Sequence, residues 1–191
     1  MAKTASTMLA LGSVAPDFSL PTPDGTSHTF AELRGKLGTL VMFICNHCPY
    51  VIHLKKELSK LGQESLDRGV GVVAINSNDY EKYQDDSPQK MQLDSKEFNY
   101  RFPYLIDQDQ SVAKAYRASC TPDFFLFDSK DLLVYRGQFD ASRPGNDQPV
   151  NGEDLRNAVS AICDGIPISD VQTPSIGCNI KWQPGNEPDY F

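Results

Sequence analysis

The ten residues from Leu40 to Pro49, LVMFICNHCP, decide the fold of this 191-residue chain. The first five are all apolar, as expected of a strand that is covered on both faces. From Pro49 onward, apolar residues recur at spacings of three and four as far as Leu61, which is typical of a helix with one buried face. A buried strand therefore runs directly into a helix, and the C-x-x-C of Cys45 and Cys48 lies at the junction.

This junction predicts redox chemistry for the two cysteines. The first sulfur, that of Cys45, is placed at the helix N-terminus, where unpaired N–H groups and the helix dipole favour a thiolate. Only the thiolate of a cysteine is nucleophilic, so the position selects for thiol–disulfide exchange. The alternative interpretation is a pair of structural cysteines.

The remaining pattern predicts a mixed α/β sheet. Residues 17–30 form a hairpin with its turn at Asp24-Gly25, and residues 70–75 form a second buried strand, parallel to the first and reached by a right-handed crossover. Further elements follow in the order helix 88–99, strand 104–107, helix 111–116, hairpin 124–135, loop 139–151 and a last helix that ends at Gly165. Parallel strands followed by an antiparallel hairpin indicate a mixed sheet with helices on both faces.

We expect one domain over residues 1–165 and a separate tail over residues 166–191. The tail carries four prolines and shows no periodicity. Its single tryptophan, Trp182, and its neighbouring isoleucines favour a segment that packs on the domain over one that is disordered. Cys178 lies in this segment, where it either reaches the active site or is an inert thiol.

Composition limits the class of protein. The net charge of −7 argues against nucleic acid or an anionic membrane as the main partner, because both need a basic surface. No apolar stretch is long enough to span a bilayer, and the apolar residues 8–11 are too few for a signal peptide. Five cysteines are an odd number at low density, which disfavours a secreted disulfide framework. We therefore expect a cytoplasmic protein.

Three motifs together carry a family resemblance: Ala15-Pro16-Asp17-Phe18, the C-x-x-C followed by Pro49, and Cys120-Thr121-Pro122 ahead of the later hairpin. From about Leu11 to Gly165 the chain resembles the thioredoxin superfamily, and more closely its peroxiredoxin-like (AhpC/TSA-like) branch with a C-x-x-C. The resemblance implies a thioredoxin-like fold. It also implies that Cys45 is the exposed, attacking thiol and that Cys48, one turn further into the helix, is the resolving thiol.

The same resemblance gives Thr121 and Pro122 a role in substrate binding. It implies a cis peptide bond at Pro122 that holds the chain facing the C-x-x-C, where the backbone of Thr121 can pair with an extended substrate. The alternative is a trans proline at the start of a strand.

Other side chains have more than one interpretation. His47, as an imidazolium, would stabilise a neighbouring thiolate, unless it only faces solvent. Cys120 is a third redox thiol, a metal ligand or a small buried residue, and Cys163 belongs to the core. The acidic residues show no usable pairing, and His28 and His53 are isolated.

Two alternatives to a thiol–disulfide oxidoreductase remain open. In a thiol peroxidase with antioxidant activity, Cys48 would be the peroxidatic thiol, since Pro49 follows it as in peroxiredoxins, and Cys45 would capture the sulfenic acid. Val41 and Cys45 replace the Pro and Thr of that family, and an activating arginine has no clear counterpart.

The other alternative is a module that binds Zn or Cu(I) through soft ligands, namely Cys45, Cys48, Cys120 and Cys178. In the redox interpretation we expect no cofactor and no metal. The partners would be protein or small-molecule disulfides, possible peroxides and an upstream dithiol reductant.

Overall fold

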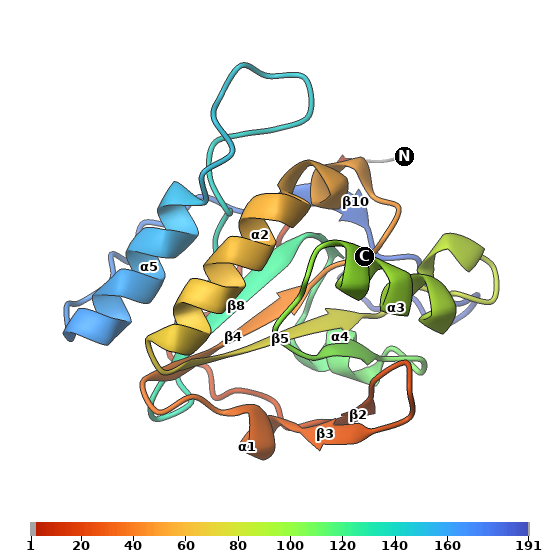
Figure 1. The fold of residues 1–191 in the computed structure, drawn as a ribbon, viewed down its shortest axis with the longest axis horizontal. Helices are drawn as coiled ribbons and strands as arrows, with labels where there is room; N and C mark the ends of the chain where they lie inside the picture. The colour runs from red at the N-terminus through yellow and green to blue at the C-terminus, as the bar shows by residue number, and fades with distance from the viewer. Residues whose placement is uncertain (1–2, 191) are drawn as a thin grey trace.

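A five-stranded mixed sheet forms the centre of the molecule (Figure 1). The structure, a computed structural model, describes residues 3–190. The strands lie in the order β6 (Tyr104–Ile106), β5 (Val70–Asn76), β4 (Gly38–Phe43), β8 (Asp123–Asp128) and β9 (Leu133–Tyr135). The first three are parallel to one another, whereas β8 pairs antiparallel with β4 and β9 pairs antiparallel with β8. The predicted mixed sheet is confirmed.

Helices cover both faces of this sheet. Figure 1 shows α2 (Pro49–Asp67) and α5 (Glu153–Asp164) on one side, and α1 (Phe30–Leu33) with the hairpin of β2 (Ser19–Pro21) and β3 (Ser27–Thr29) on the other. Successive side chains of a strand point to opposite faces, so Leu40 and Met42 belong to the first layer of the core and Val41 and Phe43 to the second.

Three further helical segments complete the fold: α3 (Pro88–Glu97), α4 (Ser111–Ala115) and the short 3-10 segment Gln84–Asp86. Helix α3 ends two residues earlier than predicted, and Asn99 adopts the left-handed conformation with φ 52°. Helix α5 is bounded by Gly152 and Gly165, both with positive φ. In residues 3–190, no helix combines the length and the apolar character that a membrane span requires.

A second, smaller sheet joins the two ends of the chain to the middle. It has the order β1 (Lys3–Ala5), β10 (Ile176–Asn179) and β7 (Cys120–Thr121), with both pairings antiparallel. Ile180 and Trp182, just after β10, are buried in the layer of the core that contains Val41 and Phe43. The sequence did not predict β10, because four residues that include a glycine give no alternation to detect.

Candidate active site

Helix α2 begins at Pro49, and Cys48 is its N-cap residue with extended backbone angles (φ −68°, ψ 125°). Proline suits the first helical position because its missing N–H would have no partner there. Cys45 therefore lies before the helix, directly after Ile44, and Cys48 occupies the N-terminus. The expectation that Cys48 lies one turn inside the helix is wrong, because α2 starts at Pro49, four residues after Cys45.

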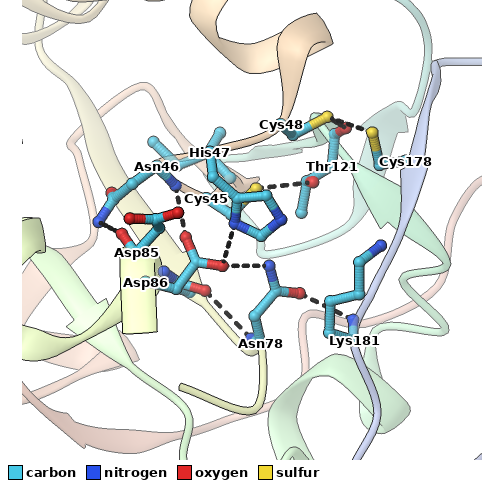
Figure 2. Close-up of polar contacts among 12 residues, drawn as sticks. Cys45, Asn46, His47, Cys48, Asn78, Asp85, Asp86, Thr121, Cys178 and Lys181 are labelled. Atoms are coloured by element: carbon cyan, nitrogen blue, oxygen red, sulfur yellow. Dashed lines mark hydrogen bonds and ion pairs between the residues drawn. The ribbon is translucent and has the colours of Figure 1, made fainter. Parts of the chain in front are cut away.

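Both cysteines of the C-x-x-C are buried, with exposed fractions of 1% for Cys45 and 0% for Cys48. The expectation of an exposed Cys45 is therefore also wrong. Cys45 Sγ lies 3.1 Å from Thr121 Oγ1, and Cys48 Sγ lies 3.2 Å from the carbonyl oxygen of Thr121 (Figure 2). A third sulfur, that of Cys178, lies 2.8 Å from Cys48 Sγ. The segment around Thr121 and strand β10 enclose the two thiols.

Contacts among these three sulfurs shift their pKa values in opposite directions. A hydrogen bond from Cys45 is the largest influence on Cys48; together with bonds from Cys178 and the backbone N–H of Val51 it outweighs burial and lowers the pKa of Cys48 to about 5. Burial raises the pKa of Cys45 well above its ordinary value and that of Cys178 to about 12. Among the three thiols, Cys48 therefore has the lowest pKa, and the pKa values of its two neighbours are raised.

His47 is paired with a buried acid that the sequence did not single out. Its Nδ1 lies 2.7 Å from Asp86 Oδ2, and its ring stacks on Tyr83. The hydrogen bond that His47 donates to Asp86 raises the pKa of His47 above its ordinary value, against the effect of burial. His47 is therefore held in one orientation, and its charged form is favoured. These contacts exclude the alternative interpretation, in which His47 only faces solvent.

Asp86 itself connects the C-x-x-C loop to the neighbouring strand. Its carboxylate accepts hydrogen bonds from the backbone N–H of Asn46 and from Asn78 Nδ2, both at 2.7 Å (Figure 2). Burial raises the pKa of Asp86, but the bonds from His47, Asn78 and Asn46 outweigh it and the pKa is lowered. No local motif marks this residue, because its partners come from segments that only the fold brings together.

Lys55 fixes the loop from the helix side. It is buried on α2, and its Nζ donates to the carbonyl oxygen of Asn46 at 3.0 Å and to Asp94 Oδ1 at 2.5 Å. Helical periodicity placed this lysine among polar residues between the apolar positions. The structure instead buries it as part of an ion pair with α3, under the loop that carries His47.

The bond between Thr121 and Pro122 is cis. Strand β10 pairs with β7 beside it, in a register that sets Cys178 opposite Thr121. Gly177 makes this approach possible, since a Cβ at that position would lie 2.0 Å from the carbonyl oxygen of Thr121. The backbone edge where the resemblance places an extended substrate is therefore occupied by the chain itself.

The remaining predicted residues have other hydrogen-bond partners or lie against the core. Cys120 is fully buried, with its Sγ 3.5 Å from the carbonyl oxygen of Pro122, and burial raises its pKa well above the ordinary value. Cys163 is half-buried against the core on α5. His53 Nε2 lies 3.2 Å from Ser142 Oγ. Cys120 fits the interpretation of a small buried residue.

The predicted set of soft metal ligands is not assembled. Within residues 3–190, the one group of potential metal ligands whose donor atoms lie within 4.8 Å of one another is Cys45, His47 and Asp86. The Asp86 carboxylate already binds Asn46 and Asn78, and the pKa of Cys45 is raised, whereas a metal ligand must be a thiolate. This arrangement is that of a hydrogen-bonded redox site.

Comparisons with known proteins agree with this geometry. The AhpC/TSA family model matches residues 11–136. The thiol-disulfide oxidoreductase ResA of Geobacillus thermodenitrificans is 33% identical over 132 residues, which cover 65% of this chain and 67% of ResA. A crystal structure of an uncharacterized conserved protein from Geobacillus kaustophilus is 48% identical with a TM-score of 0.94, and covers 97% of this chain and 98% of its own.

The fold also resembles that of a more distant protein. The thioredoxin domain of a thiol-disulfide oxidoreductase from Bacteroides vulgatus superposes with a TM-score of 0.62 at 22% identity, over 81% of this chain and 99% of that domain. At this identity the likeness shows the fold alone, which is thioredoxin-like as predicted.

Proposed function

This chain belongs to the AhpC/TSA family and is a thiol–disulfide oxidoreductase, and from that premise we propose how its thiols divide the reaction. Its substrates are disulfides, and a reductant must restore its thiols after each turnover. The observation that carries the proposal is the lowered pKa of Cys48 at the start of α2, beside two thiols that stay protonated.

Cys48 is the nucleophile in this proposal. Its thiolate attacks one sulfur of the substrate disulfide, and the other substrate sulfur leaves as a thiolate and takes up a proton. The resulting mixed disulfide is attacked at the Cys48 sulfur by Cys45, which loses its proton to the departing second thiol. The products are two substrate thiols and a Cys45–Cys48 disulfide, so two electrons and two protons pass to the substrate. These roles are the reverse of those expected from the sequence.

His47 and Asp86 act as positioning residues. The imidazolium is held by Asp86 near the thiolate, and each raises the preference of the other for its charged form. A thiolate stabilised in this way is a better leaving group, which makes the disulfide form of the protein easier to reduce.

We further propose that the preferred substrates are compact disulfides of low molecular mass and that the protein works in the reducing cytosol. Burial of both C-x-x-C sulfurs and the occupied edge of Thr121 support the first point, because an extended polypeptide would have to displace β10 to pair there. The odd number and low density of cysteines support the second.

Turnover of a small disulfide with a dithiol reductant tests the division of roles. We expect reduction of bis(2-hydroxyethyl) disulfide to be faster than that of insulin, and to be abolished by Cys48→Ser. Cys163→Ser, on a half-buried thiol away from the site, should keep wild-type turnover. If Cys48→Ser still forms a mixed disulfide on Cys45, while Cys45→Ser forms neither a mixed disulfide nor an internal disulfide at Cys48, the assignment of the nucleophile is wrong.

Peroxide reduction is a second candidate, because Cys48 is a thiolate at a helix N-terminus followed by Pro49. In that reaction the thiolate attacks a peroxide oxygen, releasing an alcohol or water and leaving a sulfenic acid, which a neighbouring thiol converts to a disulfide and water. A coupled assay with hydrogen peroxide would support it if consumption is catalytic and depends on Cys48. If each chain instead reacts with peroxide only once, so that thiols are lost in stoichiometric amount without turnover, this antioxidant activity is excluded.

A further inference from the structure

The shortest contact between sulfur atoms recorded in the described chain joins residues that are 130 positions apart. Cys48 Sγ lies 2.8 Å from Cys178 Sγ, and both side chains are buried, with Cys178 3% exposed. A thiol and a thiolate at this distance need only a small movement to form a disulfide bond. The tail thus delivers a third thiol directly to the proposed nucleophile (Figure 2).

Strand β10 holds this thiol in place from both sides. It pairs with β1, where Cys178 lies opposite Lys3, and with β7, where Cys178 lies opposite Thr121. Beyond the strand, the backbone N–H of Lys181 donates to Asn78 Oδ1 at 2.8 Å, which ties the tail to the residue that also binds Asp86. The position of Cys178 is therefore fixed by backbone pairing and by the same network that holds His47.

The geometry of β10 is that of an extended substrate paired beside the cis-proline. An antiparallel strand that adds to an exposed edge presents alternate side chains to the protein beneath it. Here the side chain presented to the C-x-x-C is a thiol, that of Cys178 opposite Thr121. The neighbouring Gly177 lets the strand come this close, because a Cβ at position 177 would lie 2.0 Å from the carbonyl oxygen of Thr121. The tail supplies, within the same molecule, the sulfur that a disulfide substrate would offer.

We propose that Cys178 is a third catalytic thiol, which resolves the mixed disulfide on Cys48 and gives the enzyme a second internal disulfide, Cys48–Cys178. This step rests on the proposed function, in which Cys48 carries the mixed disulfide. The sulfur of Cys178 attacks Cys48 Sγ and forms the Cys48–Cys178 bond, while the bond from Cys48 to the substrate sulfur breaks. The departing substrate thiolate takes the proton that Cys178 loses, so the charge balances.

Cys45 and Cys178 then compete for the same sulfur. A Cys48–Cys178 disulfide can be opened by Cys45, which forms the Cys45–Cys48 disulfide and returns the proton and electrons to Cys178. Oxidised enzyme is therefore an equilibrium between two internal disulfides, one within the C-x-x-C and one that bridges it to the tail.

Disulfide mapping in the Cys45→Ser variant tests the proposal, because it leaves Cys178 as the only resolving thiol of the pair. Reduced protein is mixed with one equivalent of bis(2-hydroxyethyl) disulfide, quenched in acid, alkylated and digested. We expect two mercaptoethanol molecules released per chain and a peptide pair joined through Cys48 and Cys178. In Cys45→Ser/Cys178→Ser we expect one mercaptoethanol and a stable adduct on Cys48, and Cys163→Ser serves as the control.

A lasting adduct on Cys48 in Cys45→Ser, with Cys178 free, overturns the role of Cys178 but leaves the proposed function intact. If no variant forms an adduct or disulfide at Cys48, the proposed function fails, and the inference with it. Wild-type protein gives an independent measurement that does not depend on the folding of a variant. Its oxidised form should contain both the Cys45–Cys48 and the Cys48–Cys178 peptides, and the absence of the second contradicts the proposal.

Discussion

The pKa of the buried Cys48 thiol is low because of hydrogen bonds with its neighbours, not because water solvates the thiolate. Cys45 is the main donor, and Cys178 and the N–H of Val51 add to it at the start of α2. His47 lies nearby, and its contact with Asp86 raises the pKa of the imidazole and favours its charged form. At the residue scale, the site is a set of groups whose protonation states depend on one another.

Replacement of Asp86 by asparagine tests this dependence. Asp86→Asn removes the carboxylate that raises the pKa of His47, so the midpoint of the His47 titration, followed by NMR, should fall below that of the wild type. Because a raised histidine pKa contributes stability below its ordinary value of 6.5, the variant should lose more thermal stability at pH 6 than at pH 8.

Asp85→Asn is the matched control for this variant. Asp85 is exposed, and its contact with the site is the hydrogen bond that its backbone carbonyl accepts from Asn46 Nδ2. In Asp85→Asn, the midpoint of the His47 titration should equal that of the wild type. An unchanged His47 midpoint in Asp86→Asn would show that the ion pair does not set the protonation of His47.

The sequence identified the residues of the proposed reaction better than those that position them. Cys45, Cys48, His47 and Cys178 could be selected because their chemistry is rare and local motifs mark them. The order of the three thiol pKa values could not be predicted from the sequence. It depends on which sulfur donates a hydrogen bond to which, and on the start of α2 at Pro49. Asp86 was missed since it meets Asn46 and Asn78 only after folding.

At the scale of elements, the packing of α2 against α3 depends on a buried ion pair. Lys55 joins α2 to Asp94 of α3 and to the carbonyl oxygen of Asn46. Lys55→Met leaves the Asp94 carboxylate buried without its partner, which should cost about 3–5 kcal/mol of unfolding free energy at neutral pH. Burial already raises the pKa of Asp94, so the loss should shrink as the pH falls and the acid is protonated.

Chemical denaturation of Lys55→Met at two pH values measures this effect. Lys56→Met is the control on the same helix, because Lys56 is exposed, and it should change stability by less than about 0.5 kcal/mol. Equal effects of the two substitutions would mean that the ion pair to Asp94 contributes nothing beyond an ordinary surface contact.

The approach of β10 to β7 depends on a glycine. Gly177→Ala would place a Cβ 2.0 Å from the carbonyl oxygen of Thr121, so the strand must shift. We expect the unfolding free energy to fall by about 1–3 kcal/mol, as for other overpacked sites. We also expect a thiol reagent to label Cys178 faster than in the wild type. Glu187→Ala, at an exposed tail position, should leave both unchanged. Labelling of Cys178 at the wild-type rate in Gly177→Ala would contradict this account.

Long periodic elements were predictable, and short paired ones were not. Helix α2 and strands β4 and β5 follow directly from apolar spacing, and the hairpin of β8 and β9 from its turn. Strands β1, β7 and β10 have two to four residues each and exist because they pair with one another. Their partners come from the first, middle and last parts of the chain, so no window of sequence contains the signal.

At the scale of the whole molecule, the low pKa of Cys48 should affect how the unfolding free energy depends on pH. In the reduced protein the pKa of Cys48 is about 5, against an ordinary value of 9.0, so between these pH values the unfolded chain binds the extra proton. The unfolding free energy should therefore rise with pH across this window, by up to about 1.4 kcal/mol per pH unit. Above the window, the raised pKa values of Cys45 and Cys178 reverse the trend.

Other groups contribute in the same range, so the comparison needs Cys48→Ser. Burial raises the pKa of Asp123 to about 7, which makes stability fall as the pH rises towards that value in both proteins. The difference between wild type and Cys48→Ser, measured by denaturation of the reduced forms, isolates the thiolate. A difference that does not change between pH 5 and pH 9 would show that Cys48 ionises equally in the folded and unfolded chains.

The most direct test is the titration of the Cys48 thiolate in the folded, reduced protein, followed by its ultraviolet absorbance and corrected with Cys48→Ser. The account predicts one thiolate with a midpoint near pH 5, present in wild type and Cys163→Ser and missing from Cys48→Ser. A midpoint near the ordinary thiol value of 9.0, or an early thiolate that survives in Cys48→Ser and disappears in Cys45→Ser, would contradict it.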